Sequence, residues 1–432
     1  MTAVAALRGR VAGLLRRRRS RLGGYAIAAE MAGLVAGLAN FVLLARVLGP
    51  TDYGLIAGAW ALVLATSPVA IVGANRLVTR GVASRGQRPA EALGEGLLTV
   101  AVGGTVALLL LVALHPFLLP QVPVALVVGL AVADIFCLGA TLCLSALLYA
   151  TDDGRAVGLV AVVSSTAKVA AVVIFTLTGS DDPVRWAQLY ALLSVVALVL
   201  QLAWSWRRFG RPTPGWRGLW GRARSGAGFS VNNAAVTVLT DFDKTLLVRN
   251  GLTTDAGVYG VAYRLSTIAS LPIVGFMHAT YPRFFEIGEA GGLQANAAFA
   301  RKLAIPLALY GVMAGLALIV VAPLIPLVVG EGFRPSVPVL MLLAGLPLLR
   351  PLQSLPSDAL TGADMQSTRT ACWVAAAVLN VGLNLVLIPR HGLTGALVTT
   401  GISELFLLVL VALAVRRGLQ ASDAQRTAAA PA

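Results

Sequence analysis

Charged residues are scarce in this chain of 432 residues: they make up 12% of it, against 57% hydrophobic residues, and the mean hydropathy is +0.82. A globular protein carries about 25% charged residues because its surface must be wetted. Most of this chain therefore cannot face water. The composition excludes an ordinary soluble enzyme.

Cysteine, histidine and lysine each occur only three times. Cys137, Cys143 and Cys372 lie in apolar runs and predict buried thiols without a disulfide framework. No two histidines have metal-ligand spacing, so we expect no metal site and no cofactor. No lysine follows a glycine, which excludes a GxxxxGK phosphate loop.

Aromatic residues are also few, at 6%, and no basic run is interleaved with them. The net charge of +15 therefore does not indicate nucleic acid as a partner. We expect a membrane surface to be the partner of this charge.

Long apolar runs are what the chain has instead. About 20 apolar residues cross a bilayer, and runs of that length, broken by Pro, Gly or charge, predict an all-α polytopic membrane protein with about twelve transmembrane helices. The predicted spans are roughly 24–45, 54–74, 93–114, 122–150, 156–178, 186–206, 226–248, 256–279, 303–329, 336–360, 370–389 and 392–415.

The distribution of Lys and Arg predicts the orientation of these spans. With a cytoplasmic N-terminus, the inside segments hold 25 of the 34 basic residues and the outside loops hold five. The positive-inside rule therefore predicts that both termini are cytoplasmic. The basic start of the chain is interpreted as the approach to an uncleaved first helix, because the apolar run after it is too long for a signal peptide.

The loops predict the domain organisation. No outside loop exceeds about ten residues, so there is no external domain to hold an enzyme site. The largest inside segment, 207–225, carries Trp and Arg together and predicts a short helix in the headgroup layer, which either anchors the chain or senses lipid. We expect a first six-helix bundle at 1–206, this amphipathic connector at 207–225 and a second bundle at 226–432.

An internal repeat supports two halves. A shift of 203 residues superposes two stretches of the form R-x5-D-x-G-x4-A-[WY]-x-L. The first is Arg46, Asp52, Gly54, Ala59, Trp60, Leu62, and the second is Arg249, Asp255, Gly257, Ala262, Tyr263, Leu265.

A weaker echo at a shift of 212 pairs Leu148, Ala150 and Asp152 with Leu360, Gly362 and Asp364. Because six is an even number, each half begins on the same side of the membrane, so the repeats are parallel and related by an axis along the membrane normal. Transporters built in this way place the substrate between their halves.

Polar residues in the seventh span form a stripe. At 100° per residue, one face carries Asn233, Thr237, Thr240, Asp241 and Lys244. A charge at the bilayer centre costs about 2.5–3.5 kcal/mol on the insertion scale, so we expect this stripe to face a cavity or another helix. Asp241 and Asp243 spell DxD, but in an apolar helix we do not expect them to hold a metal.

Further polar groups lie in the other spans. The eighth contains Tyr259, Tyr263 and Arg264, and the fifth contains Lys168. Arg350 lies among prolines of the tenth span, where we expect the helix to be broken and its carbonyls bare. Acidic groups in the spans are Glu30, Asp134, Asp358 and Glu404.

Structural roles for these groups stay open. Asp241 and Lys244 could neutralise each other at i, i+3, and Asp134 or Glu404 could pair between helices.

The chain resembles the multidrug/oligosaccharidyl-lipid/polysaccharide exporter superfamily, and within it the Wzx-like bacterial polysaccharide flippases. The likeness covers nearly the whole chain. The matching pieces are RVLGPTDYG at 46–54, DKTLL at 243–247, AGVYGVAYRL at 256–265, YPR at 281–283 and LVVGEGF at 327–333.

This resemblance implies two six-helix bundles that open alternately inward and outward. It implies a flippase that moves a polyprenyl-pyrophosphate-linked oligosaccharide to the outer leaflet of the bacterial plasma membrane, as a monomer among membrane lipids, beside the polymerase and glycosyltransferases of the same pathway. An anionic head group needs cations along its path, and the candidates are Lys244, Arg264, Lys168 and Arg350.

Two alternatives remain. A cation-coupled multidrug antiporter of the same superfamily would bind protons or sodium at acidic and polar cavity groups. The candidates for such coupling are Glu30, Asn233, Asp241, Asp243, Tyr259 and Tyr263. A membrane scaffold without transport would not need the polar stripe of the seventh span.

Overall fold

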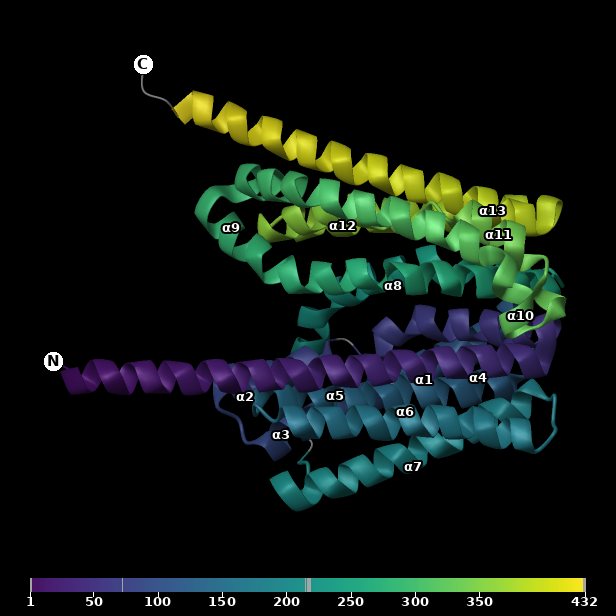
Figure 1. The fold of residues 1–432 in the computed structure, drawn as a ribbon, viewed down its shortest axis with the longest axis horizontal. Coiled ribbons are helices and arrows are strands. Elements are labelled where there is room, and N and C mark those ends of the chain that lie inside the picture. Colours follow the sequence, from purple (N-terminus) through teal and green to yellow (C-terminus); the bar gives the residue numbers. More distant parts are fainter. Residues whose placement is uncertain (1, 72, 214, 216–218, 430–432) are drawn as a thin grey trace. The chain divides into compact units, whose positions relative to one another are not determined.

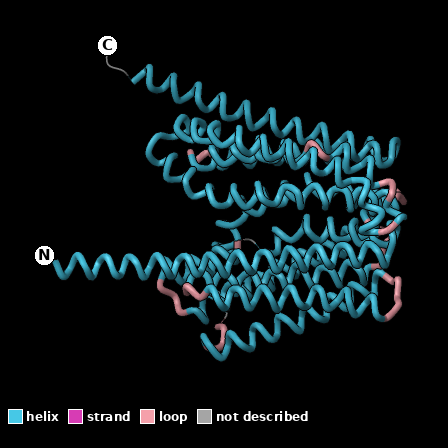
Figure 2. The backbone as a smooth tube through the Cα atoms, in the orientation of Figure 1, coloured by secondary structure: helices cyan, strands magenta, loops and turns pink. Residues whose placement is uncertain are grey.

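The computed structural model describes the backbone of residues 2–71, 73–213, 215 and 219–429, and the side chains of 33–68, 70–71, 73–213, 215 and 230–422. Within these residues the chain is helical, contains no strand, and its helices are joined by short loops (Figure 2). The prediction of an all-α protein is confirmed.

The helices are labelled in chain order in Figure 1. Their bounds are α1 Thr2–Ile71, α2 Ala74–Arg85, α3 Pro89–Leu118, α4 Val124–Ala131, a π-helical turn Val132–Cys137, α5 Leu138–Ala150, α6 Gly154–Leu177, α7 Pro183–Phe209, α8 Leu219–Arg249, α9 Thr253–Val321, α10 Ile325–Val329, α11 Ser336–Leu343, α12 Leu346–Gly362 and α13 Gln366–Ala429. Short 3-10 turns lie at Ala322–Leu324 and Glu331–Phe333.

The described residues contain eight helical runs that are long and apolar enough to cross a membrane. Three of these runs are divided by a glycine with a positive φ, at Gly49 (69°), Gly292 (62°) and Gly392 (54°), a conformation that costs glycine little. Helix α8, Leu219–Arg249, covers the seventh predicted span, 226–248. The described chain therefore accommodates the twelve predicted spans.

Large apolar side chains remain exposed on these helices. Leu109 of α3 is 65% exposed, Leu177 of α6 80% and Val320 of α9 76%. Backbone groups of helices are satisfied internally, so helices that present such faces suit hydrocarbon as their solvent. The exposed apolar faces therefore agree with a multi-pass membrane protein.

The chain divides into two compact units. Unit 1 comprises Met1–Val47, Thr66–Pro116 and Val122–Ser230, and unit 2 comprises Leu48–Ala65, Phe117–Gln121 and Val231–Ala432.

In unit 1, helices α2, α3, α5 and α6 share a core that includes Val78, Leu93, Leu147 and Val157. In unit 2, α9 packs against α12 around Phe284 and neighbouring apolar residues.

The echo at a shift of 212 is visible in the backbone. Asp152 and Asp364 both have a positive φ, 64° and 60°, and no other described residue except glycine does so. After Asp152, the Asp153 N–H donates to the Leu148 carbonyl (3.0 Å), and after Asp364, the Met365 N–H donates to the Leu360 carbonyl (2.9 Å). Both halves thus end a helix with the same left-handed cap.

The repeat at a shift of 203 produces a direct contact inside unit 2. The hydroxyls of Thr51 and Thr254, which hold equal positions in the two stretches, are 2.9 Å apart. A Cβ on Gly54 or on Gly257 would overlap backbone atoms of the other segment. The two segments therefore cross where only glycine fits, and repeat-related residues meet each other.

The expected break of the tenth span at Arg350 is wrong. The helix α12 runs without interruption through Pro351, and the break lies earlier, at Ala344 and Gly345 between α11 and α12. Pro347 occupies the first turn of α12, where its missing N–H has no partner to lose. The proline therefore starts a helix here.

The connector predicted at 207–225 falls largely outside the described residues. The end of α7 at Phe209 and the loop that follows it to Thr213 are described, and the side chains of Trp216 to Phe229 are not. The division at 206 and 226 and the amphipathic character of the connector stay predictions.

Candidate functional site

A buried ion-pair cluster lies at the C-terminal end of α8. The Lys244 Nζ is 2.8 Å from an Asp241 carboxylate oxygen and 3.6 Å from one of Asp243. It also donates to the Thr240 carbonyl at 3.1 Å. The Lys244 side chain is 8% exposed, that of Asp243 1% and that of Asp241 28%, so Asp241 forms the open side of the cluster.

Two tyrosines of α9 cover the ammonium group. The Lys244 Nζ is 4.3 Å from the ring centroid of Tyr263 and 5.5 Å from that of Tyr259. Such cation–π contacts are attractive when they are desolvated. The Tyr259 hydroxyl is 2.9 Å from that of Thr400 on α13, and Arg350 of α12 donates to the Tyr263 hydroxyl at 3.3 Å. Four helices of unit 2 therefore meet at these rings.

The acid Glu404 of α13 lies in the same region. Its carboxylate accepts a hydrogen bond from Gln353 of α12 at 2.7 Å, and both side chains are buried. The described cluster thus holds two cations, Lys244 and Arg350, and three carboxylates, Asp241, Asp243 and Glu404. Its formal charge is not positive, and the ammonium of Lys244 is already shared by two acids.

The structure brings together six of the head-group and coupling candidates singled out in the sequence: Asp241, Asp243, Lys244, Tyr259, Tyr263 and Arg350. Arg264 follows Tyr263 in α9 and is exposed, and among the described residues no hydrogen bond or ion pair joins it to Lys244. Asn233 lies two turns before Asp241, where its carbonyl accepts from Thr237. Glu30 belongs to the part of α1 whose side chains the structure does not describe.

Lys168 belongs to a different polar group, in unit 1. Its Nζ is 6.0 Å from the ring centroid of Tyr190, and the Tyr190 hydroxyl donates to Asp134 at 2.8 Å. Asp134 lies in the π-helical turn between α4 and α5. A small cavity of about 30 Å³, the size of one water molecule, opens beside Lys168. The pairing of Asp134 across helices, left open by the sequence, is observed.

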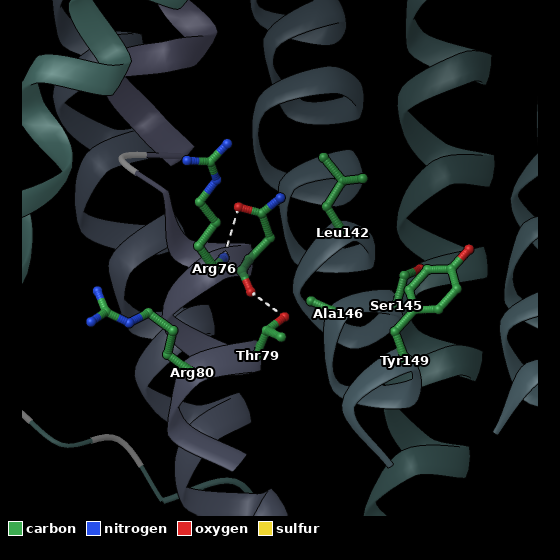
Figure 3. Close-up of a pocket in the computed structure, with 8 residues that line it drawn as sticks. Arg76, Thr79, Arg80, Leu142, Ser145, Ala146 and Tyr149 are labelled. Carbon is green, nitrogen blue, oxygen red and sulfur yellow. Dashed lines mark hydrogen bonds between the residues drawn. The ribbon is translucent and has the colours of Figure 1, made fainter. Parts of the chain in front are cut away.

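A larger pocket of about 440 Å³ was not anticipated from the sequence (Figure 3). It lies in unit 1 between α2 and α5. Its lining residues are Asn75, Arg76, Thr79, Arg80, Leu142, Ser145, Ala146 and Tyr149. Arg76 and Arg80 were counted among the basic residues of the inside segments. Nothing in the sequence indicated that their helix, α2, packs beside α5.

Solved structures with the same fold are transporters. The chain is 18% identical to a multidrug resistance MATE family transporter of the MOP superfamily in an inward-facing conformation, with a TM-score of 0.67 over 92% of this chain and 94% of that one. For an outward-facing conformation of a MATE family transporter the identity is 16%, the TM-score 0.65 and the coverage 94% and 96%.

A third structure, 13% identical with a TM-score of 0.53, covers 92% of this chain and 95% of that one. It is a MOP superfamily transporter from Pyrococcus furiosus, described by a reverse polarity of its binding pocket that suggests a different function. The chain therefore has the all-helical, multi-pass membrane fold of these MOP superfamily transporters.

A comparison of the sequence with protein-family models shows the family of the chain. The model of the polysaccharide biosynthesis protein family matches residues 23–288, which is more than half of the chain. The chain belongs to the polysaccharide biosynthesis protein family. No curated protein matches it.

Proposed function

We propose that this protein moves a lipid-linked oligosaccharide or polysaccharide repeat unit from the cytoplasmic to the outer leaflet of the bacterial plasma membrane by alternating access. The observation that carries this proposal is membership in a polysaccharide biosynthesis family by a chain with the fold of MOP transporters. In this proposal both termini are cytoplasmic, and the protein works as a monomer beside the polymerase and glycosyltransferases of its pathway.

Lys244 is the proposed contact for the anionic head group. Asp241 is the more exposed of its two carboxylate partners, and a phosphate oxygen can compete with Asp241 for the ammonium. Asp243 and the two tyrosine rings hold Lys244 in position during this exchange. The head group would then take the place of Asp241 at the ammonium, while the partly exposed Asp241 carboxylate keeps the hydrogen bond that it accepts from the Thr240 hydroxyl at 3.0 Å.

The other cations have separate proposed roles. Arg264 is exposed and offers a planar fork that fits phosphate in two hydrogen bonds. Arg350 acts through Tyr263, whose hydroxyl it donates to. Lys168 lies with Asp134 and Tyr190 in unit 1 and serves as a second contact along the path.

The experiment is deletion of the gene followed by analysis of surface glycan and of lipid-linked intermediates. The test variant is Lys244→Met with Asp241→Asn, which removes the ion pair as a unit. We expect it to be present at normal levels, to leave the glycan absent and to trap intermediates on the cytoplasmic side. The matched control is Lys302→Met, an exposed lysine outside the cluster, which should restore export.

Normal surface glycan in cells with the double variant at normal protein levels would contradict the role of Lys244. Normal glycan after deletion of the gene itself would contradict the flippase.

One observation favours a cation-coupled multidrug antiporter as the second candidate. Carboxylates outnumber cations in the buried cluster of unit 2, which suits the binding of a proton or a sodium ion. In that case deletion would leave intermediates unchanged and would sensitise cells to cationic drugs. Measuring both properties in the same deletion strain separates the two candidates.

A further inference from the structure

A second pocket, of about 430 Å³, lies in unit 2 where α9, α12 and α13 pack against one another. Its floor is apolar and belongs to the core of that unit. Ala300 of α9 and Leu355 and Ala359 of α12 are buried there, and Val415 and Leu419 of α13 pack against them. The volume lies in the range of small-molecule sites, about 300–1,000 Å³.

The pocket exists because much of its wall is alanine. Ala297, Ala300 and Ala304 recur at intervals of three and four residues, which places them on one face of α9. Helix α12 adds Ala359 and helix α13 adds Ala412. Methyl groups fill little of the space between helices, so room remains for an apolar ligand. Ala412 is exposed and belongs to the twelfth predicted span, so the pocket opens on a side where hydrocarbon is expected.

Two arginines lie at one end of this apolar pocket. Arg301 of α9 and Arg416 of α13 both line it, and both are exposed. Arg301 comes two residues before the predicted span 303–329, and Arg416 directly follows the predicted span 392–415. Arginine near the end of a membrane helix reaches the headgroup layer. The pocket therefore crosses the boundary between hydrocarbon and headgroups.

Neither guanidinium is neutralised by an acid of the described residues. The Arg301 Nε donates to the Ala297 carbonyl at 3.4 Å, and in the described part of the chain no ion pair joins Arg301 or Arg416 to a carboxylate. The exposed Arg334, by contrast, pairs with Glu331. None of the thirteen residues that line the pocket is acidic. Such a pocket is complementary to a ligand with an anionic head and an apolar tail.

The face of α13 that leads to Arg416 extends the apolar surface. Leu405, Val409, Ala412 and Arg416 follow one another at intervals of four, three and four residues, so they share one face of the helix. Leu405 and Val409 are exposed large apolar side chains. An acyl chain can lie along this face while its head group stays beside Arg416.

We propose that this pocket binds an anionic glycerophospholipid of the surrounding membrane, with its phosphate at Arg301 and Arg416 and an acyl chain against the alanine-lined wall. Basic pockets between membrane helices suit anionic lipid head groups on the cytoplasmic side, where the basic residues of this chain predict both arginines to lie. Gln420, exposed at the same pocket, offers a neutral donor to the phosphate or glycerol oxygens. This lipid is bound whatever substrate the protein moves, because the site uses no residue of the Lys244 cluster.

Native mass spectrometry tests the preference for an anionic lipid. Full-length protein, delipidated in maltoside detergent, is mixed with equal amounts of phosphatidylglycerol and phosphatidylcholine of the same chain length. We expect the unchanged protein to hold phosphatidylglycerol over phosphatidylcholine at least tenfold, and Arg301→Gln/Arg416→Gln to bind the two lipids within twofold of each other.

The matched control is Lys302→Gln/Arg417→Gln. It removes the same charge one residue further along the same two helices, from exposed side chains that do not line the pocket, and should keep the preference within twofold of the unchanged protein. Loss of the preference in both double variants would show that the lipid follows the charge of the surface, which overturns the proposal. Equal binding of the two lipids by the unchanged protein would overturn it as well.

A second pair of variants tests the apolar part of the pocket without removing a charge. Ala412→Phe places a ring in the pocket and should weaken phosphatidylglycerol binding at least fivefold. Ala375→Phe makes the same change at an exposed alanine of α13 outside the pocket and should stay within twofold. Unweakened binding in Ala412→Phe would refute the site even if the arginine variants failed to fold.

Protein purified without delipidation identifies the natural occupant. We expect added phosphatidylglycerol to displace a glycerophospholipid from the unchanged protein and not from Arg301→Gln/Arg416→Gln. Displacement of a polyprenyl-linked lipid instead would assign the pocket to a transported substrate and overturn the proposal.

Discussion

The crossing of Gly54 and Gly257 makes a quantitative prediction about stability. A Cβ on Gly54 would overlap the Thr253 carbonyl oxygen and approach the Gly257 nitrogen, both of which are backbone atoms. Backbone atoms cannot move away by a change of rotamer, as the atoms of a side chain can. The Gly54→Ala variant must therefore move the two helical segments apart. Overpacking of this kind costs about 1–3 kcal/mol.

The same substitution elsewhere provides the control. Gly275 lies in α9 with no atom within 4 Å of an added Cβ. Alanine there gains helix propensity without a clash, which stabilises a helix by up to about 1 kcal/mol. We therefore expect the free energies of unfolding of Gly54→Ala and Gly275→Ala to differ by about 1–4 kcal/mol, with Gly54→Ala the less stable.

The assay is reversible unfolding in mixed micelles of increasing SDS content, followed by tryptophan fluorescence. Gly257→Ala should behave as Gly54→Ala does, because its added Cβ overlaps the Pro50 carbonyl oxygen. Equal stability of Gly54→Ala and Gly275→Ala would refute the close crossing of the two segments.

Three other substitutions, a labelling experiment and two fusions test the remaining structure. Lys244→Met alone should lower the free energy of unfolding by about 3–5 kcal/mol, because it leaves buried carboxylates unpaired; adding Asp241→Asn should recover part of this loss in the same SDS titration. Gln201→Leu should cost about 1–3 kcal/mol, because Gln201 joins Thr141, Ser164 and the Val160 carbonyl; a thermal unfolding shift checks this, and an unchanged midpoint would contradict it. The three cysteines are buried, so a maleimide should label native protein far less than protein in SDS. A green fluorescent protein fused to the C-terminus should fluoresce and an alkaline phosphatase fusion should be inactive, because the basic residues predict a cytoplasmic C-terminus.

Much of the fold could be predicted because hydropathy and repetition are local signals. The apolar runs located the twelve spans, and the shifts of 203 and 212 residues anticipated features that the structure displays. Thr51 meets Thr254, and Asp152 and Asp364 share a left-handed backbone. The predicted effect of the prolines in the tenth span was wrong. Pro347 lies in the first turn of α12, while Pro351 and Pro356 lie inside the helix, and in sequence all three look the same as prolines that break a helix.

The candidate site was predictable only in part. Helical phase placed Asp241 and Lys244 on one face of α8, and they do form an ion pair. It could not show that Tyr259 and Tyr263 cover the same ammonium group, because that contact depends on how α8 and α9 pack. The pocket at Arg76 could not be predicted for the same reason. It depends on the packing of α2 against α5, and these two helices are separated in sequence by α3 and α4.

The hydrogen bond between Thr51 and Thr254 has the form of an isologous contact, in which a residue meets its own counterpart across a two-fold axis. Two separate copies of one such segment could make this contact with each other. The chain that joins the two segments therefore acts as a tether, which holds two self-complementary stretches of unit 2 at a high effective concentration.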